Sequence, residues 1–316
     1  MNPLKIVAID EKNTSYPSKA FPPKTNRQET QGRFEILWHR QPEKFDPLKS
    51  CMEVKRLSRT LELIEKTCSI KGKKLVDLGC GCGVLSRKLR DKGAFITAVD
   101  VAKNALENFR KNDADKIILT HDCFPQTRFD DGSFDIVLCT DLIAYLRPKE
   151  YRISVSELAR LVKKEGVIVC STPIDIYSEG VLEQFFALLE TELTILEWKL
   201  SYHSYYIRIR NIFKSTLKFA RGGVESDYRE KEIQKRKGFA KFWYTINSGA
   251  VMGNFWKFLK PLMQVLYNGV NKNATLMICL EKMCRFLSQE SGVSHVIIVA
   301  ERRSLKKAGD DSKLRG

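Results

Sequence analysis

The chain is 316 residues long, enough to bury one large core or one core with a sizeable insertion. Its 43% hydrophobic and 29% charged residues are typical of a soluble globular protein. The sequence has neither the basic start and apolar segment of a secretory signal nor an uncharged apolar run of roughly 18 residues, which a membrane-spanning helix needs. The nine cysteines are odd in number and scattered through predicted strands, which argues against a disulfide framework and favours a cytoplasmic location.

The formal net charge of +16 is concentrated late in the chain. Between residues 205 and 285 there are 16 lysines and arginines against 5 aspartates and glutamates, a local excess of +11. Such an excess favours an anionic partner, either nucleic acid or a lipid surface, although a solvated basic face without a partner has the same composition.

The first part of the chain shows little periodicity. Residues 1–32 are rich in Lys, Pro, Ser, Thr and Asn and are expected to form a flexible arm. Residues 33–48 mix aromatic residues with Pro and predict either a lid over a pocket or a packed strap. From Met52 to Cys68 apolar residues recur at helical spacing, which predicts an amphipathic helix.

A regular alternation of short apolar runs and amphipathic segments follows. It predicts helices at 84–93, 102–112, 148–166 and 181–191. Continuous apolar runs that alternate with helices are typical of a parallel sheet covered on both faces, here a Rossmann-like α/β sheet of seven strands. The predicted strands are 74–79, 95–101, 116–122, 133–141, 166–173, 193–203 and 295–303.

The long separation between the last two strands indicates that an insertion interrupts the sheet. This insertion carries the basic excess. The predicted organisation is an N-terminal arm and lid (1–50), a core (51–204), a basic amphipathic helical insertion (205–293), a final core strand (294–303) and a disordered tail (304–316).

The stretch KLVDLGCGCGVLSRKL (74–89) places a glycine-rich turn between the first strand and a helix. Such a turn lets the backbone approach a ligand closely at a helix N-terminus. Glycines at 79, 81 and 83 with Val84 do not match the G-x-G-x-x-G of dinucleotide sites, and no Gly-Lys-Ser/Thr follows as in a phosphate loop. Cys80 and Cys82 lack a second Cys/His pair at zinc spacing, so we expect no metal.

With Asp100 ending the second strand, Asp122 in LTHDC and the FDIVLCTDLIAYL strand, the chain resembles the class I S-adenosylmethionine-dependent methyltransferases. The resemblance runs from about residue 70 to 204 and resumes at the last strand. Within the family, GKKLVDLGCGCGVLSRKLRDKGAFITAVDV and IVCSTP are most similar to the methyltransferases of ubiquinone biosynthesis.

The resemblance implies S-adenosylmethionine as the cofactor and methyl donor. The glycine turn would lie against its methionine part, Asp77 would face its amino group, and Asp100 would accept hydrogen bonds from the ribose hydroxyls. Asp122 would lie beside the adenine amino group. The implied cofactor-binding residues are Asp77, Gly79, Cys80, Gly81, Asp100, Val101, Asp122, Cys123, Thr140 and Asp141.

Two departures from the family pattern stand out. The turn before the fifth strand is commonly Lys-Pro-Gly-Gly in relatives and is KKEG here, far from the chemistry in that topology. Many relatives carry Glu-His after the fourth strand, where this chain has Ala144 and Tyr145, so a base or metal role of that His is not carried over.

Methyl transfer from a sulfonium needs a positioned nucleophile, and an oxygen nucleophile usually needs a base. The candidate bases near the predicted cleft are Tyr145, His203 and Asp141. Each also has a plain structural explanation, as a core aromatic, a hydrogen-bonded strand histidine and a cofactor-side acid respectively.

The insertion predicts a basic amphipathic helix in IRIRNIFKSTLKFAR. Aromatic residues then accompany Lys241, Lys257 and Lys260, as at a membrane interface, although the same helices would serve as a substrate cap. The apolar stripe of the first helix is Ile209, Ile212, Phe213 and Leu217, and its basic stripe is Arg210, Lys214, Lys218 and Arg221.

The sequence therefore favours a cytoplasmic methyltransferase, peripheral on the inner face of a membrane, that acts on a lipid-like acceptor such as a quinone-precursor hydroxyl. A second hypothesis is methylation of protein or nucleic acid docked by the insertion. Against nucleic acid, the Asn/Asp-Pro-Pro-Tyr/Phe motif is absent after the fourth strand, which reads TDLI. Methylation of a soluble metabolite and binding without chemistry are compatible with the same motifs.

Overall fold

The computed structural model describes residues 27–40, 42–175, 180–235, 237–246 and 250–303. Most of the predicted N-terminal arm and the predicted tail lie outside the described residues. The chain divides into two compact units, which we call the sheet unit (residues up to Pro47, Arg56–Ser201 and Ser294 onward) and the helical unit (Leu48–Lys55 and Tyr202–Val293).

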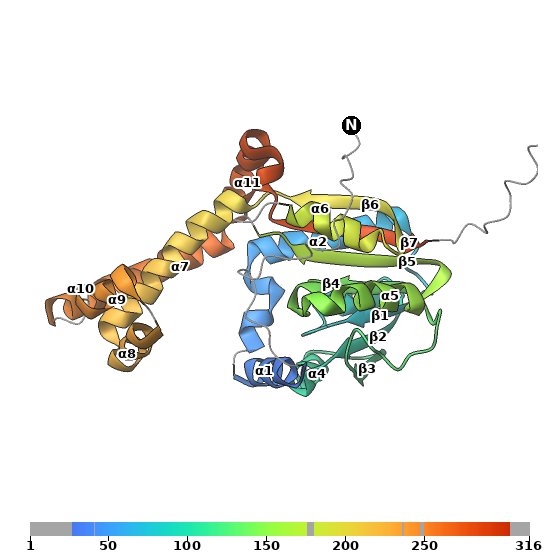
Figure 1. Cartoon of the computed structure of the whole chain (residues 1–316), viewed down its shortest axis with the longest axis horizontal. Coiled ribbons are helices and arrows are strands. Elements are labelled where there is room, and N and C mark those ends of the chain that lie inside the picture. Colours follow the sequence, from blue (N-terminus) through green and yellow to red (C-terminus); the bar gives the residue numbers. More distant parts are fainter. Residues whose placement is uncertain (1–26, 41, 176–179, 236, 247–249, 304–316) are drawn as a thin grey trace, which may run out of the picture. The chain divides into compact units, whose positions relative to one another are not determined.

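The sheet unit is built on one seven-stranded sheet in the order β3-β2-β1-β4-β5-β7-β6, which confirms the predicted Rossmann-like fold (Figure 1). The strands β1 to β5 pair in parallel, whereas β7 runs antiparallel to both β5 and β6. The strands are β1 Lys74–Leu78, β2 Phe95–Asp100, β3 Ile117–His121, β4 Phe134–Thr140, β5 Val162–Pro173, β6 Leu193–Ser201 and β7 His295–Arg302.

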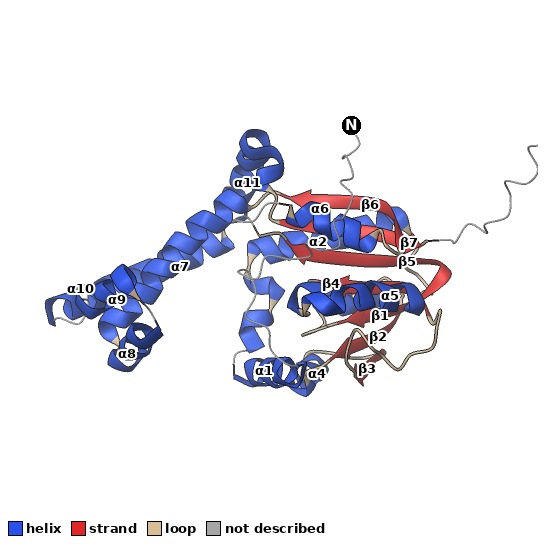
Figure 2. Ribbon diagram, in the orientation of Figure 1, coloured by secondary structure: helices blue, strands red, loops and turns tan. Residues whose placement is uncertain are grey.

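Helices flank this sheet on both faces (Figure 2). Leu75, Ile136 and Val167 share one face by register and belong to a buried cluster with apolar residues of α2, α3 and α4. Successive strand residues point to opposite faces, so the equally buried residues between them face α5 and α6. The helices are α1 Arg27–Arg40, α2 Cys51–Thr67, α3 Val84–Asp91, α4 Lys103–Lys111, α5 Tyr151–Leu161 and α6 Val181–Leu189.

Three elements differ from the sequence-based expectation. The helix predicted to run to residue 166 ends at Leu161, and Val162 already pairs with Phe134 in β5, ahead of a bulge. The next two lysines and Glu165 are therefore strand residues rather than a turn, with Lys163 Nζ 2.9 Å from an Asp135 carboxylate oxygen. The sheet is mixed rather than wholly parallel because of β7. Finally, α1 begins at Arg27, inside the segment predicted to be an irregular arm.

The helical unit contains the insertion between β6 and β7. Its packing centres on α7 and α10: the Tyr206 side chain is fully buried and its hydroxyl donates to the Val270 carbonyl at 2.9 Å. Phe219 lies edge-on to Tyr244 and Trp256, with ring centroids 5.4 and 5.6 Å away. The helices are α7 Ser204–Val224, α8 Ser226–Lys235, α9 Gly238–Ile246, α10 Ala250–Lys272 and α11 Ala274–Ser288.

The predicted apolar stripe of α7 is only partly buried. Ile209, Phe213 and Leu217 are half-buried, but the Ile212 side chain is 66% exposed. Within the described residues, no helix is both long enough and apolar enough to cross a membrane.

Gly83 gives a test of how tightly the glycine loop is packed. It has φ +72°, and a Cβ there would lie 2.1 Å from Cζ of the buried Phe109 ring. We expect Gly83→Ala to lower the free energy of unfolding, measured by urea titration, by about 3 kcal/mol, because left-handed strain and overpacking add.

Gly72→Ala is the matched control. Gly72 has φ +77°, but no atom lies within 4 Å of where its Cβ would be, so only the backbone strain of about 1 kcal/mol should appear. Equal losses in the two variants would contradict the assigned packing against Phe109.

Candidate functional site

The predicted site residues gather at the edge of the sheet where the parallel strands end. Because β7 is antiparallel, its first residue, His295, lies at this same edge, opposite Pro173 of β5 and Ser201 of β6. Ligands of open parallel sheets bind outside the carboxyl ends of the strands. The edge therefore combines the glycine loop with the residues that follow β2, β3 and β4 and with the start of β7.

The glycine loop is tied to the end of β2. The backbone N–H groups of Gly79 and Cys80 both donate to the Val99 carbonyl, at 2.8 and 3.0 Å. Gly79 and Gly81 have φ values of +72° and +55°, which a side chain would strain. A Cβ on Gly79 would lie 3.1 Å from Leu142 Cδ1, so the segment after β4 packs directly on the loop.

Asp100 joins the glycine loop to the next turn. Its Oδ2 accepts the N–H of Gly81 at 3.0 Å and its Oδ1 accepts the N–H of Ala102 at 2.9 Å. Burial raises the pKa of this carboxyl, and the two backbone donors partly offset that rise. A buried carboxylate with two backbone donors still has lone pairs for two further donors, as a ribose diol would supply.

The Asp77 carboxyl group is buried beneath the glycine loop. It is 2% exposed, and its carboxylate accepts the Ser86 hydroxyl at 2.5 Å. Burial raises its pKa to about 6, against the lowering effect of Ser86 and with a smaller rise from the neighbouring Asp100. A contact between Asp77 and a cofactor amino group stays a prediction.

The two loop cysteines are neutral thiols. Burial raises the pKa of Cys80 well above its ordinary value and also raises that of Cys82, whereas metal binding requires a thiolate. The nine cysteines all lie in the described part of the chain, and none of them forms a disulfide there. Among the described residues, no group of three His, Cys, Asp or Glu side chains is placed to hold a metal ion.

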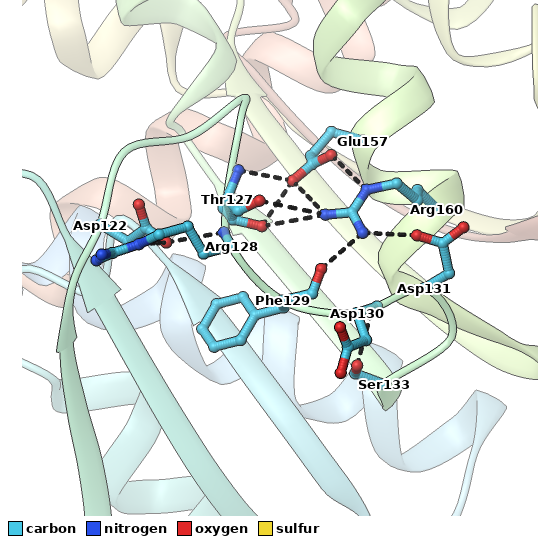
Figure 3. Close-up of polar contacts among 9 residues, drawn as sticks. All are labelled: Asp122, Thr127, Arg128, Phe129, Asp130, Asp131, Ser133, Glu157 and Arg160. Atoms are coloured by element: carbon cyan, nitrogen blue, oxygen red, sulfur yellow. Dashed lines mark hydrogen bonds and ion pairs between the residues drawn. The ribbon is translucent and has the colours of Figure 1, made fainter.

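Asp122 is held in a braced loop between β3 and β4 (Figure 3). Its two carboxylate oxygens accept the N–H of Cys123 at 2.8 Å and of Arg128 at 3.0 Å. Burial pushes the pKa of Asp122 up, but these backbone donors and the Arg128 charge outweigh it, and the pKa is lowered. Val101 accepts a hydrogen bond from the His121 ring at its carbonyl, 3.0 Å away.

The brace comes from two residues of α5 that the sequence did not single out. Arg160 donates to the Phe129 carbonyl at 2.6 Å and to Asp131 at 2.7 Å, and its Nε donates to Glu157 at 2.8 Å. Glu157 in turn accepts both the backbone N–H and the hydroxyl of Thr127, at 2.9 and 2.6 Å. The loop that presents Asp122 and Cys123 is thus fixed to a helix (Figure 3).

Asp141 is the centre of a charged cluster just after Thr140, the last residue of β4. It has φ +56°, and its carboxylate lies 2.7 Å from Arg56 Nη1, 2.8 Å from His295 Nε2 and 2.8 Å from the Ser171 hydroxyl. Burial pushes its pKa up, but Arg56 and then His295 outweigh burial and hold the pKa well below its usual range. A carboxylate with so low a pKa is a poor general base.

The other two candidate bases are placed less favourably. Tyr145 is 45% exposed and its ring meets Phe34 edge-on at 5.2 Å. His203 belongs to the helical unit, where it is buried with its Nε2 3.5 Å from a Glu281 carboxylate oxygen. The residue that sequence reasoning missed is His295, because its position at this edge depends on the antiparallel direction of β7.

The segment 33–48 covers part of the glycine loop. Trp38 of α1 is 4% exposed and stacks on Phe45, with ring centroids 4.6 Å apart. A Cβ on Gly81 would lie 3.2 Å from the Trp38 ring. Glu35 accepts a hydrogen bond from the Asn104 amide at 2.7 Å, which fixes α1 to α4.

Residues 76–170 match the family model described as a methyltransferase domain. The match confirms the resemblance to the class I S-adenosylmethionine-dependent methyltransferases over this part of the chain. The chain is 32% identical over 116 residues to the ubiquinone biosynthesis O-methyltransferase of Coxiella burnetii, which covers 35% of this chain and 48% of that protein. It is 26% identical over 182 residues to the enzyme of the same name from Aromatoleum aromaticum, covering 56% and 74%.

The chain thus spans about half the length of the Coxiella relative. Among solved structures, it is similar to the N-methyltransferase NodS from Bradyrhizobium japonicum in complex with S-adenosylhomocysteine. That similarity has a TM-score of 0.46 at 17% identity and covers 54% of this chain and 89% of the other.

The buried Asp77 carboxyl predicts a pH-dependent stability. A folded-state pKa of about 6 against 3.8 means that the protonated form is favoured by folding, so this contribution is complete below about pH 4 and lost as the pH rises through 6. Asp77→Asn keeps the acceptor for Ser86 without the charge. Between pH 4 and pH 7, we expect the free energy of unfolding of Asp77→Asn to rise by about 2 kcal/mol relative to that of wild type, measured by urea titration.

The difference between the two proteins removes the background from other titrating groups. Parallel stability curves for wild type and Asp77→Asn across this interval would show that Asp77 ionises normally.

Proposed function

We propose that this chain is an S-adenosylmethionine-dependent methyltransferase that acts on a lipid-like acceptor, with a quinone-precursor hydroxyl as the leading case. The observation that supports it most is the geometry of Asp100 and the glycine loop inside the matched methyltransferase domain. The name of the relatives, ubiquinone biosynthesis O-methyltransferase, supports the choice of acceptor and of oxygen as the methylated atom.

The residues at the carboxyl edge fit an adenosyl cofactor. Asp100 would hold the ribose hydroxyls, the backbone of Gly79, Cys80 and Gly81 would lie against the methionine part, and Asp122 with Cys123 would meet the adenine. Val101, Thr140 and Asp141 would complete the contacts, and Asp77 would act from below the loop. When bound, the cofactor supplies an electrophilic methyl group on a sulfonium.

The protein's own contribution is positioning and exclusion of water. The loop that carries Asp122 is braced by Arg160, and the glycine loop is fixed by Asp100, so the site is formed before a ligand binds. Trp38 and Phe45 lie over the glycine loop and would shield the reacting atoms from solvent. The segment 33–48 would therefore serve as a lid.

The helical unit supports a peripheral location on the cytoplasmic face of a membrane. Five apolar residues of α10 recur at helical spacing and stay exposed: Phe255 (49%), Phe258 (83%), Leu262 (51%), Val265 (67%) and Leu266 (42%). We call this set the α10 ridge. Such a set of exposed apolar side chains suits insertion between lipid headgroups.

The positive charge of this region also favours binding to an anionic membrane. The region from 205 to 285 has an excess of +11, and each basic residue near an anionic surface contributes about 1 kcal/mol to binding. A membrane-bound enzyme meets a greasy acceptor at high local concentration, which connects the helical unit to the proposed chemistry.

Methylation of a macromolecule is the second candidate, and the same basic excess favours it. Nucleic acid would be attracted by the charge, with an affinity that falls steeply with salt. The exposed apolar ridge is better matched to lipid than to a phosphate backbone.

The class of acceptor is tested by incubating the protein with methyl-labelled S-adenosylmethionine and a membrane-containing cell extract. We expect label in the organic phase after solvent partition. Asp100→Ala should bind S-adenosylhomocysteine about 10- to 100-fold more weakly by calorimetry, because hydrogen bonds to a charged acceptor contribute about 1.5–3 kcal/mol. The same variant should transfer little label.

Label in precipitated protein or nucleic acid would overturn the lipid-like acceptor and favour the second candidate. Absence of cofactor binding in the wild-type protein would overturn the methyltransferase assignment itself.

Membrane binding is tested by flotation with vesicles of phosphatidylcholine containing about one-third phosphatidylglycerol. We expect the wild-type protein to float with these vesicles and much less with pure phosphatidylcholine. Phe258→Ser should lower the partition coefficient about 10-fold or more, since burying a Phe side chain contributes about 1.5–3 kcal/mol.

Phe95→Ser is the matched control, because Phe95 is 67% exposed but lies at the start of β2 in the sheet unit. Equal flotation of wild type and Phe258→Ser, or flotation that Phe95→Ser weakens as strongly, would rule out the α10 ridge as the membrane contact.

A further inference from the structure

His295 occupies a position that neither its strand nor the core explains. It is the first residue of β7 and is 8% exposed at the carboxyl edge of the sheet. Its ring is bound on one side, with Nε2 2.8 Å from Oδ1 of Asp141. On the other side, Nδ1 is buried and has no hydrogen-bond partner among the described residues.

The partner on Nε2 determines which nitrogen carries the proton. The Asp141 carboxylate also binds Arg56 Nη1 at 2.7 Å and accepts the Ser171 hydroxyl at 2.8 Å, so it is ionised and only accepts. In a neutral ring, Nε2 must therefore donate to Asp141. The lone pair of the ring is then left on Nδ1, as an acceptor without a donor.

This acceptor lies beside the place where a methyl donor would end. Asp141 holds His295, and the next residue, Leu142, packs within 3.1 Å of the position of a Cβ on Gly79 in the glycine loop. A buried polar atom without a partner is unfavourable unless a ligand or water supplies one. A hydroxyl group bound at this edge would supply the missing donor.

We propose that His295 is the catalytic base of the methyl transfer, with Nδ1 accepting the proton of the acceptor hydroxyl, and that Asp141 is a positioning residue that fixes its tautomer. This inference rests on the proposed function, because it requires an oxygen acceptor. The hydroxyl oxygen forms a bond to the methyl carbon, the carbon–sulfur bond breaks with its electron pair passing to sulfur, and the hydroxyl proton goes to Nδ1. The imidazolium then releases that proton to water.

Two arginines of α2 contact the residues that lie next to His295. Arg56 shares the Asp141 carboxylate, so the carboxylate does not bind the protonated ring alone. Arg59, also on α2, donates to the hydroxyl of Ser201 at 2.8 Å, and Ser201 pairs with His295 in the sheet.

The tautomer is measurable without any acceptor. Nitrogen-15 correlation spectra of the imidazole rings distinguish a protonated from an unprotonated Nδ1, and the chain has only four histidines. We expect the His295 signals, assigned by their loss in His295→Gln, to show an unprotonated Nδ1 and a protonated Nε2 at pH 8. Asp141→Asn, whose amide both donates and accepts, should lose this preference. A neutral ring that carries its proton on Nδ1 would overturn the proposal.

The role in catalysis is measured with labelled cofactor and the extract as the source of acceptor. Glutamine retains an Nε2 donor for Asp141 but has no basic nitrogen, so His295→Gln should lower the rate of methyl transfer about 100-fold or more. Its affinity for S-adenosylhomocysteine should stay that of wild type. The wild-type rate should fall as the pH is lowered, because a protonated ring cannot accept the hydroxyl proton, and the residual rate of His295→Gln should lack that fall.

Lys111→Gln, at an exposed position at the end of α4, is the control and should keep the wild-type rate. Transfer by His295→Gln at the wild-type rate would overturn the role of His295 while leaving the proposed function intact. No transfer by the wild-type protein, with cofactor bound, would overturn both.

Discussion

The Asp100 carboxylate is the contact on which the candidate site depends. It accepts one backbone N–H from the glycine loop after β1 and one from the turn after β2, so a single buried side chain sets the relative position of two loops. Without it, the N–H of Gly81 would need another acceptor in a segment held at positive φ. Leu142 packs on the glycine loop at Gly79, and Trp38 packs on it at Gly81. The fixed loop therefore also positions the segment after β4 and the helix α1.

Three buried or half-buried aspartates near this loop show how the hydrogen-bond and ion-pair partners of a carboxyl group set the direction of its pKa shift. Asp77 has one neutral hydroxyl as its partner, and burial raises its pKa to about 6. Asp141 has a guanidinium, a histidine and a hydroxyl as partners, and its pKa falls well below the usual range because Arg56 and His295 outweigh the effect of burial. Asp100 has backbone donors alone, and burial raises its pKa against their lowering effect. The site thus contains one carboxyl group with a pKa of about 6 and one that stays ionised across the physiological pH range.

Some large apolar and aromatic side chains of the helical unit are buried, and others are exposed to solvent. Tyr206, Tyr244 and Trp256 are buried between its helices, whereas Phe258 and Phe286 are more than four-fifths exposed. A unit stabilised by the first group does not need the second for its own folding. Phe258 lies within the region of basic excess, and Phe286 directly follows it.

The sequence by itself determined the order of the strands along the chain, the glycine loop and the acids that end β2 and β3, because those signals are local in the chain. Apolar runs, turn glycines and strand-end acids each lie within a few residues of the structure they specify. Only the tertiary structure decided the pairing of β7, which brings His295 to Asp141 across 154 positions of sequence. It also decided the brace of Arg160 on the β3–β4 loop and the early start of β5, because these depend on contacts between segments whose separation in sequence carries no periodic signal.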